Sequence, residues 1–380
     1  MERLDRFLAK SSAAFQWRPI NVPQRSHCYG LDIPRRAHGK RRKMNSGHDH
    51  HQRADAAVWI MIGVIAMAVM GFALLGPFEL DLRSFLIPGA VTALLAAGGW
   101  FYRSVRRDRR LGAILSSTAH IIGFAAVGAP LSYIAATAGF PLQDAALEAI
   151  DRQMGVDWAQ LMTFVSLHPG LQLVLSLAYS SFALQTLTTV LALGVAGQLT
   201  RLSSFIAAFV ATTLLIIAIS AVGPAAGPWL FLDIQPASAN GFLPTSSTSW
   251  PVFLALRDGT LHTVFGIRSE GIITFPSLHA ALAVLFPVAL WPVKGVRWFA
   301  LGLNILLVIA TPAYGGHYVV DVIAGILIAA ACWVAVARLL DAASDTHAEQ
   351  VAAIDDPPSI VPEAPAQPAM SALSRDFESA

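Results

Sequence analysis

Long apolar runs, separated by short polar segments, fill most of the chain between its two polar ends. A run of about 20 apolar residues forms a helix long enough to cross the hydrocarbon core of a bilayer. We therefore expect an all-α fold, a polytopic membrane helical bundle with about eight transmembrane helices. The predicted spans are residues 56–78, 85–102, 111–138, 171–197, 202–223, 276–293, 298–314 and 318–340.

Two segments between the predicted spans are too long to be simple turns. Residues 139–170 alternate apolar and charged positions as an amphipathic helix at a membrane surface does, and we expect Asp144 and Asp151 to lie on that surface. Residues 224–275 are irregular and rich in Gly, Pro and Ser. We expect this second segment to cover the residues that follow it, as a cap.

The composition agrees with a membrane protein that has polar tails. Hydrophobic residues make up 55% of the chain and charged residues 13%, about half the roughly 25% that is usual in soluble domains. We expect a disordered basic tail at 1–55, two extra N-terminal helices at 56–110, a membrane domain at 111–340 and a disordered acidic, Pro-rich tail at 341–380. The basic tail lacks interleaved aromatic residues, so we expect no nucleic-acid partner.

The distribution of Lys and Arg predicts how the spans are oriented. Basic residues concentrate in cytoplasmic loops, and a cytoplasmic N-terminus leaves few of them outside. The outer set consists only of Arg83, Arg152, Arg257 and Arg268. We therefore expect a multi-pass protein of the inner (plasma) membrane, with both termini cytoplasmic and the 224–275 segment extracytoplasmic.

Two histidines and an aspartate stand out near the predicted starts of the last and third-last spans. His279 follows Pro276, a residue favoured in the first turn of a helix, and His317 follows the break at Gly315 and Gly316. Both helices begin on the same side of the membrane, so we expect the two imidazoles to meet where two helix N-termini attract anions such as phosphate. Asp321 follows His317 by four residues, on the same helical face.

These residues occur in two short motifs that resemble a known family. Residues 275–279, Phe-Pro-Ser-Leu-His, resemble the second motif of the type 2 phosphatidic acid phosphatase superfamily, and residues 317–321, His-Tyr-Val-Val-Asp, resemble its third. The particular forms look like the branch that includes inositol phosphorylceramide synthases and related inositolphosphotransferases. The resemblance implies a six-helix phosphatase-type core within residues 111–340.

The resemblance also implies a role for each site residue. His317 would attack phosphorus and become a phosphohistidine, Asp321 would orient it, and His279 would protonate the leaving oxygen. Ser277 would bind phosphate oxygens. No metal and no other cofactor is implied.

The chain departs from the family pattern in its basic residues. The family's first motif is absent, and Ala310 and Thr311 stand where the third motif has Ser-Arg. Other cations would then have to bind the phosphate, and we expect Arg257 or Arg268 to do so, with Arg152 as the next candidate.

The resulting expectation is a lipid phosphatase or phosphotransferase that acts at the extracytoplasmic face. Its substrate would be a phospholipid, a sphingolipid or a prenyl phosphate, and its acceptor either water or a lipid alcohol. One alternative is a non-catalytic membrane transporter that retains the fold, although the spans show no paired repeat halves. Another is a haloperoxidase-like vanadate site, which the missing basic residues disfavour.

Overall fold

A computed structural model describes residues 35–234, 242–266 and 271–355. The chain divides after Lys43 into two units, and the fold described below is that of the second unit, from Met44 onward. Helix α2 (Arg35–Leu75) starts inside the segment that the sequence predicts as a disordered tail. Similarly, α14 (Val319–Asp355) continues beyond residue 341 into the other predicted tail.

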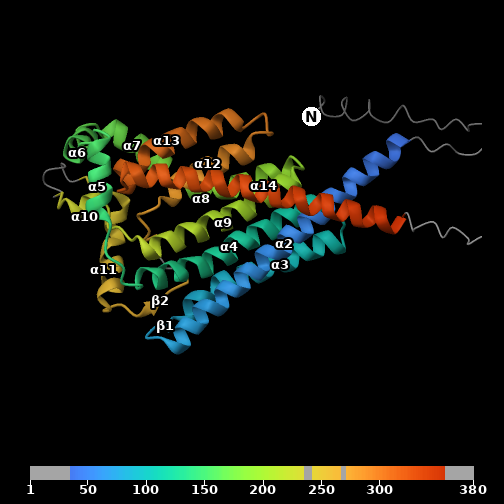
Figure 1. Cartoon of the computed structure of the whole chain (residues 1–380), viewed down its shortest axis with the longest axis horizontal. Coiled ribbons are helices and arrows are strands. Elements are labelled where there is room, and N and C mark those ends of the chain that lie inside the picture. Colours follow the sequence, from blue (N-terminus) through green and yellow to red (C-terminus); the bar gives the residue numbers. More distant parts are fainter. Residues whose placement is uncertain (1–34, 235–241, 267–270, 356–380) are drawn as a thin grey trace, which may run out of the picture. The chain divides into compact units, whose positions relative to one another are not determined.

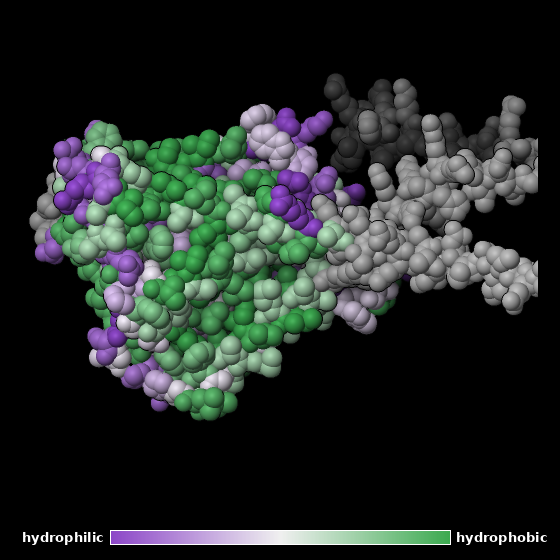
Figure 2. Space-filling model, viewed as in Figure 1, coloured by the Kyte–Doolittle hydropathy of each residue, from purple (hydrophilic) through white to green (hydrophobic). Residues whose placement is uncertain are grey.

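Among the described residues, six helices are long and apolar enough to cross a membrane, and they correspond to six of the eight predicted spans. Their outward residues are largely apolar, and Figure 2 shows apolar side chains covering much of the flank of the bundle. The multi-pass, all-α prediction is thereby confirmed. The six are the Ala54–Leu75 part of α2, α3 (Leu82–Ser104), α4 (Arg109–Ala136), α9 (Leu199–Val222), α13 (Arg297–Gly315) and the Val319–Leu340 part of α14.

The two remaining predicted spans differ in the structure. The run at 171–197 is not one helix, because it breaks at Ser181 between α7 (Pro169–Ser180) and α8 (Phe182–Val195). Helix α7 also pairs with α6 (Trp158–Ser166) at a bend of 104°, as in a broken span or a re-entrant loop. The run at 276–293 becomes α12 (Leu278–Leu290), whose 13 residues reach only about 20 Å.

Helix α12 lies at the centre of the bundle, in contact with α8, α9, α13 and α14 (Figure 1). Leu282, Leu285 and Phe286 on this helix are fully buried in the main hydrophobic cluster. The start of α12 also packs closely against α14, since a Cβ on Gly325 would collide with the carbonyl oxygen of Ser277. This close approach places the beginnings of α12 and α14 side by side.

Short elements gather at the end of the bundle where α12 and α14 begin, and we call this the cap end (Figure 1). They include the predicted surface helix, present as α5 (Asp144–Gln153), and three helices of the 224–275 segment. Those three are α10 (Pro228–Phe231), the 3-10 helix η1 (Thr245–Thr248) and α11 (Trp250–Asp258). Strand β1 (Glu79–Leu80) pairs in parallel with β2 (Thr263–Val264), which ties the α2–α3 connection to the chain that leads into α12.

Candidate active site

His317 lies at the cap end, between the last residue of α13 and the first of α14. Gly316 adopts a left-handed conformation with φ 77° and ends α13, and His317 follows it with only 4% of its surface exposed. Its Nδ1 is 2.7 Å from the carbonyl oxygen of Thr274. A carbonyl can only accept a hydrogen bond, so Nδ1 carries a proton. In the neutral form of the ring the lone pair is therefore on Nε2.

Asp321 contributes charge next to this ring but not its main hydrogen bond. The carboxylate is fully buried, and its Oδ2 is 3.6 Å from His317 Nδ1, which is longer than a hydrogen bond. The same oxygen accepts a hydrogen bond of 2.9 Å from the backbone N–H of Tyr318. The Thr274 carbonyl therefore binds Nδ1 of His317, and Asp321, when ionised, would stabilise a positive charge on the ring.

His279 is the second residue of α12 and lies near His317. The hydroxyl of Ser277 caps the helix by accepting a hydrogen bond from Ala280 N–H, and the N–H of Ser277 donates to the backbone carbonyl of Asp321. The imidazole of His279 stacks on the ring of Tyr179 at a centroid distance of 4.0 Å. The structure thus brings His279, His317, Asp321 and Ser277 together, as the sequence predicts.

Tyr179 reaches this site because Gly315 has no side chain. A Cβ at Gly315 would lie 2.6 Å from Tyr179 Cε2 and 2.9 Å from His317 Cδ2. The Tyr179 ring therefore packs against the chain that carries His317 and stacks on His279 at the same time. Sequence reasoning did not identify Tyr179, which comes from α7, far from both motifs.

Two buried aspartates of α5 hold the backbone around His317. Asp144 accepts hydrogen bonds from the N–H groups of Ala226 and Gly227, at 2.8 to 3.1 Å, and from the hydroxyl of Tyr318 at 3.0 Å. Asp151 accepts from the N–H groups at the start of α14, as described next. With exposures of 1% and 0%, the two carboxylates are not surface residues, so that prediction is wrong.

The N-terminus of α14 is already occupied by carboxylates. Val319 and Val320 donate their N–H groups to Asp151 at 2.8 and 3.0 Å, and Tyr318 donates to Asp321. Burial raises the pKa of the Asp151 carboxyl above its usual value, and these two backbone hydrogen bonds oppose that shift. The expectation that the α14 N-terminus attracts a phosphate is therefore corrected, because its positive end is neutralised by the protein's own side chains.

Arg257 and Arg152, two of the arginines expected to bind phosphate, contact other described parts of the protein and not the two histidines. Arg257 donates to the carbonyl of Phe140 at 2.8 Å, and its guanidinium lies 5.7 Å from the centroid of the Phe253 ring. Arg152 forms an ion pair with Glu148 and has 73% of its side chain exposed. Arg268 lies outside the described residues. No contact in the described part of the chain joins Arg257 or Arg152 to either histidine.

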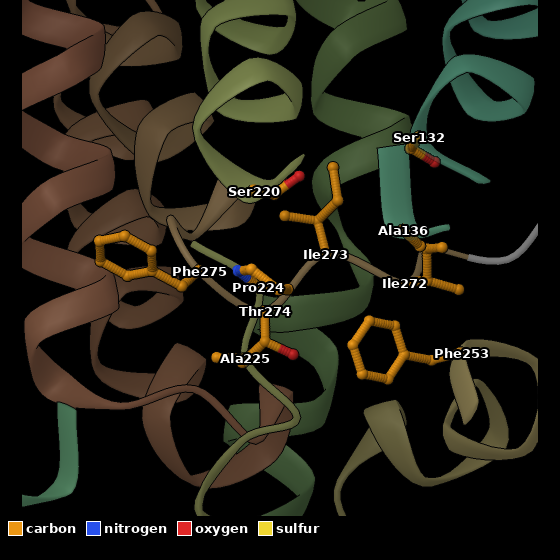
Figure 3. Close-up of a pocket in the computed structure, with 10 residues that line it drawn as sticks. All are labelled: Ser132, Ala136, Ser220, Pro224, Ala225, Phe253, Ile272, Ile273, Thr274 and Phe275. Atoms are coloured by element: carbon orange, nitrogen blue, oxygen red, sulfur yellow. The ribbon is translucent and has the colours of Figure 1, made fainter. Parts of the chain in front are cut away.

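A small cavity, of about 10 Å³ and so large enough for about one water molecule, adjoins the site (Figure 3). It is mostly apolar and lies between α4, α9, α11 and the irregular segment that leads into α12. Thr274 lines it and also accepts the hydrogen bond from His317, so the cavity lies directly beside His317. Its other lining residues are Ser132, Ala136, Ser220, Pro224, Ala225, Phe253, Ile272, Ile273 and Phe275.

Residues 35–234, 242–266 and 271–355 contain no candidate metal site. No group of three or more His, Cys, Asp or Glu side chains is arranged there to hold an ion. The carboxylates near His317 instead accept hydrogen bonds from backbone N–H groups and the Tyr318 hydroxyl.

Comparison with known families agrees with this site. The family model described as the PAP2 superfamily matches residues 145–335, just over half of the chain. That range contains His279, His317, Asp151 and Asp321, but not Asp144. Comparisons with curated proteins and with solved structures found no match. The chain belongs to the PAP2 superfamily, whose membership supports a phosphatase-type function on lipid phosphates.

Proposed function

We propose that this protein is an integral membrane lipid phosphatase or phosphotransferase that works through a phosphohistidine at His317. The observation that carries the proposal is the 2.7 Å hydrogen bond from Nδ1 to the Thr274 carbonyl, which leaves Nε2 free to attack. A neutral imidazole is a competent nucleophile at neutral pH, and a second histidine nearby can transfer the proton that the leaving oxygen needs.

The first half of the reaction forms a bond between His317 Nε2 and phosphorus while the bond to the leaving oxygen breaks. His279 gives that oxygen its proton. Asp321, whose Oδ2 is 3.6 Å from Nδ1, stabilises the positive charge that develops on the His317 ring. In the second half, an acceptor hydroxyl loses its proton to His279 and attacks the phosphohistidine.

The acceptor in that second step decides the reaction class. Water yields a phosphatase, and a lipid alcohol yields a transferase. The motif forms at 275–279 and 317–321 favour transfer, as in the inositol phosphorylceramide synthase branch that they resemble.

The phosphate of the substrate would be bound by the Ser277 hydroxyl and by an arginine of the 224–275 segment. Ser277 lies at the start of α12, next to His279, and its hydroxyl can donate to a phosphate oxygen. Arg268, which precedes this helix in the sequence and lies outside the described residues, is the preferred cation, since Arg257 is engaged with Phe140. The distribution of Lys and Arg supports an extracytoplasmic site.

A substrate panel tests this function. Purified protein in mixed micelles is incubated with ³²P-labelled phosphatidate, phosphatidylinositol and a prenyl phosphate, with and without added diacylglycerol or ceramide. Release of water-soluble phosphate identifies a phosphatase, and a new labelled lipid that depends on the alcohol identifies a transferase. Absence of turnover of all three, in protein that unfolds cooperatively, would contradict the proposal and favour a non-catalytic transporter.

A further inference from the structure

Tyr179 makes the one hydrogen bond to His279 that the described residues provide. Its hydroxyl oxygen is 3.1 Å from His279 Nδ1, in addition to the ring stacking at 4.0 Å. The ring of Phe182 packs edge-on against the same imidazole, at a centroid distance of 4.7 Å. The orientation of His279 is therefore fixed by two aromatic rings and one hydroxyl.

The direction of this hydrogen bond follows from the surroundings of the hydroxyl. Tyr179 is 7% exposed, and His279 Nδ1 is the only acceptor that the described residues offer to its O–H group. If Nδ1 were the donor, the buried hydroxyl proton would have no acceptor, which costs about 1–3 kcal/mol. The hydroxyl therefore donates to Nδ1, and the proton of the neutral imidazole lies on Nε2.

The two site histidines consequently hold opposite tautomers. His317 donates from Nδ1 to the Thr274 carbonyl and has a free lone pair on Nε2. His279 accepts at Nδ1 from Tyr179 and carries its proton on Nε2. One ring is thus prepared as the nucleophile and the other as the acid, with no need for either to be charged beforehand.

We propose that Tyr179 is a positioning residue that sets His279 as the acid and supplies a second proton through it. The inference rests on the proposed function. As His317 Nε2 bonds to phosphorus and the P–O bond breaks, the Nε2 proton of His279 moves to the leaving oxygen. The Tyr179 hydroxyl proton then moves to Nδ1, so the ring stays neutral and the phenolate oxygen holds the negative charge.

The second half of the reaction restores both protons. The attacking hydroxyl forms its bond to phosphorus, the P–N bond to His317 breaks, and the hydroxyl proton passes to His279 Nε2. The Nδ1 proton returns to Tyr179. The relay lets the neutral His279 ring give up its Nε2 proton without becoming an imidazolate, because the Tyr179 hydroxyl replaces that proton at Nδ1.

The dependence of kcat on the leaving group distinguishes this role from a structural one. A nitrophenolate can leave without receiving a proton, whereas an alkoxide must be protonated as it leaves. The variant Tyr179→Phe keeps the stacked ring and removes only the hydroxyl. Tyr314→Phe is the matched control. The centroids of the Tyr314 and Tyr179 rings are 5.7 Å apart, but Tyr314 makes no hydrogen bond to His279. The substrate pairs are dodecyl phosphate with p-nitrophenyl phosphate, and didodecyl phosphate with dodecyl p-nitrophenyl phosphate.

We expect Tyr179→Phe to lose on the order of 10²-fold in kcat on the alkyl substrate and less than about threefold on the nitrophenyl partner. His279→Ala should show the same selectivity, and adding Tyr179→Phe to it should cost nothing further, as for two residues that act in one step. Tyr314→Phe should leave both rates near wild type.

Equal losses on both members of a pair, or additive losses in the double variant, would overturn the role of Tyr179 while leaving the proposed function intact. Absence of wild-type turnover on both pairs would contradict the proposed function itself, and this inference with it.

Discussion

The substitution Gly315→Ala tests whether the close packing of Tyr179 against the His317 segment sets the geometry of the site. The added Cβ would lie 2.6 Å from Tyr179 Cε2 and 2.9 Å from His317 Cδ2, whereas ordinary contacts begin near 3.4 Å. One or both rings must therefore move by about 0.8 Å. A misplacement of about 1 Å in a site that depends on near-attack geometry costs on the order of 10² in rate.

This change should leave the fold in place. Gly315 is the last residue of α13 and its φ is not positive, so alanine fits the backbone and is the better helix former by up to about 1 kcal/mol. Gly302→Ala is a matched control on the same helix, because nothing lies within 4 Å of the Cβ it would add. Any gain from helix propensity is shared by the two variants.

The assay is steady-state release of ³²P from the substrate that the wild-type protein turns over, together with thermal unfolding in detergent. We expect Gly315→Ala to lose about 10² in kcat with a midpoint within a few degrees of wild type. Gly302→Ala should keep its full rate. If Gly315→Ala turned over within about threefold of wild type, the packing of Tyr179 against this segment would not control the histidine geometry.

Three further predictions address the charge, the cation and the orientation of the site. Because the Thr274 carbonyl already fixes the His317 tautomer, Asp321→Asn should cost about 10² in kcat; a loss near 10⁴ would mean that Asp321 itself orients the ring. Arg257→Ala should change kcat less than about threefold, since its guanidinium binds Phe140, and a large loss shared by Arg257→Lys would place this arginine on the phosphate instead. In a chain without native cysteines, Thr248→Cys should react with an impermeant maleimide on intact cells and Gly295→Cys only after lysis, and the reverse pattern would invert the membrane orientation.

The sequence indicates the residues of the candidate site more directly than it indicates the residues that support them. His279, His317 and Asp321 stand at the starts of apolar runs, where an ionisable group is costly and therefore conspicuous. We expect them to lie close together because the last and third-last predicted spans begin on the same side of the membrane. The long spans follow equally well from the runs of apolar residues, because only length and hydropathy are needed to recognise them.

The supporting residues lack such signals. Asp144 and Asp151 lie in a charged, amphipathic segment that predicts a surface helix, and their burial depends on backbone N–H groups from two distant segments. The Thr274 carbonyl that fixes His317 is a backbone atom, which no side-chain pattern can reveal. The break at Ser181 could not be predicted either, because the apolar run continues through it without Pro or Gly.

Direct detection of the covalent intermediate tests the central claim that Nε2 of His317 attacks phosphorus. The protein is mixed with ³²P-labelled substrate, quenched in alkali within the first turnover, digested and sequenced by mass spectrometry. We predict an acid-labile, alkali-stable phosphoryl group on His317, which is absent from His317→Ala and accumulates in a variant whose second step is slowed. Turnover without a phosphoenzyme, or phosphate carried on another residue, would contradict the account.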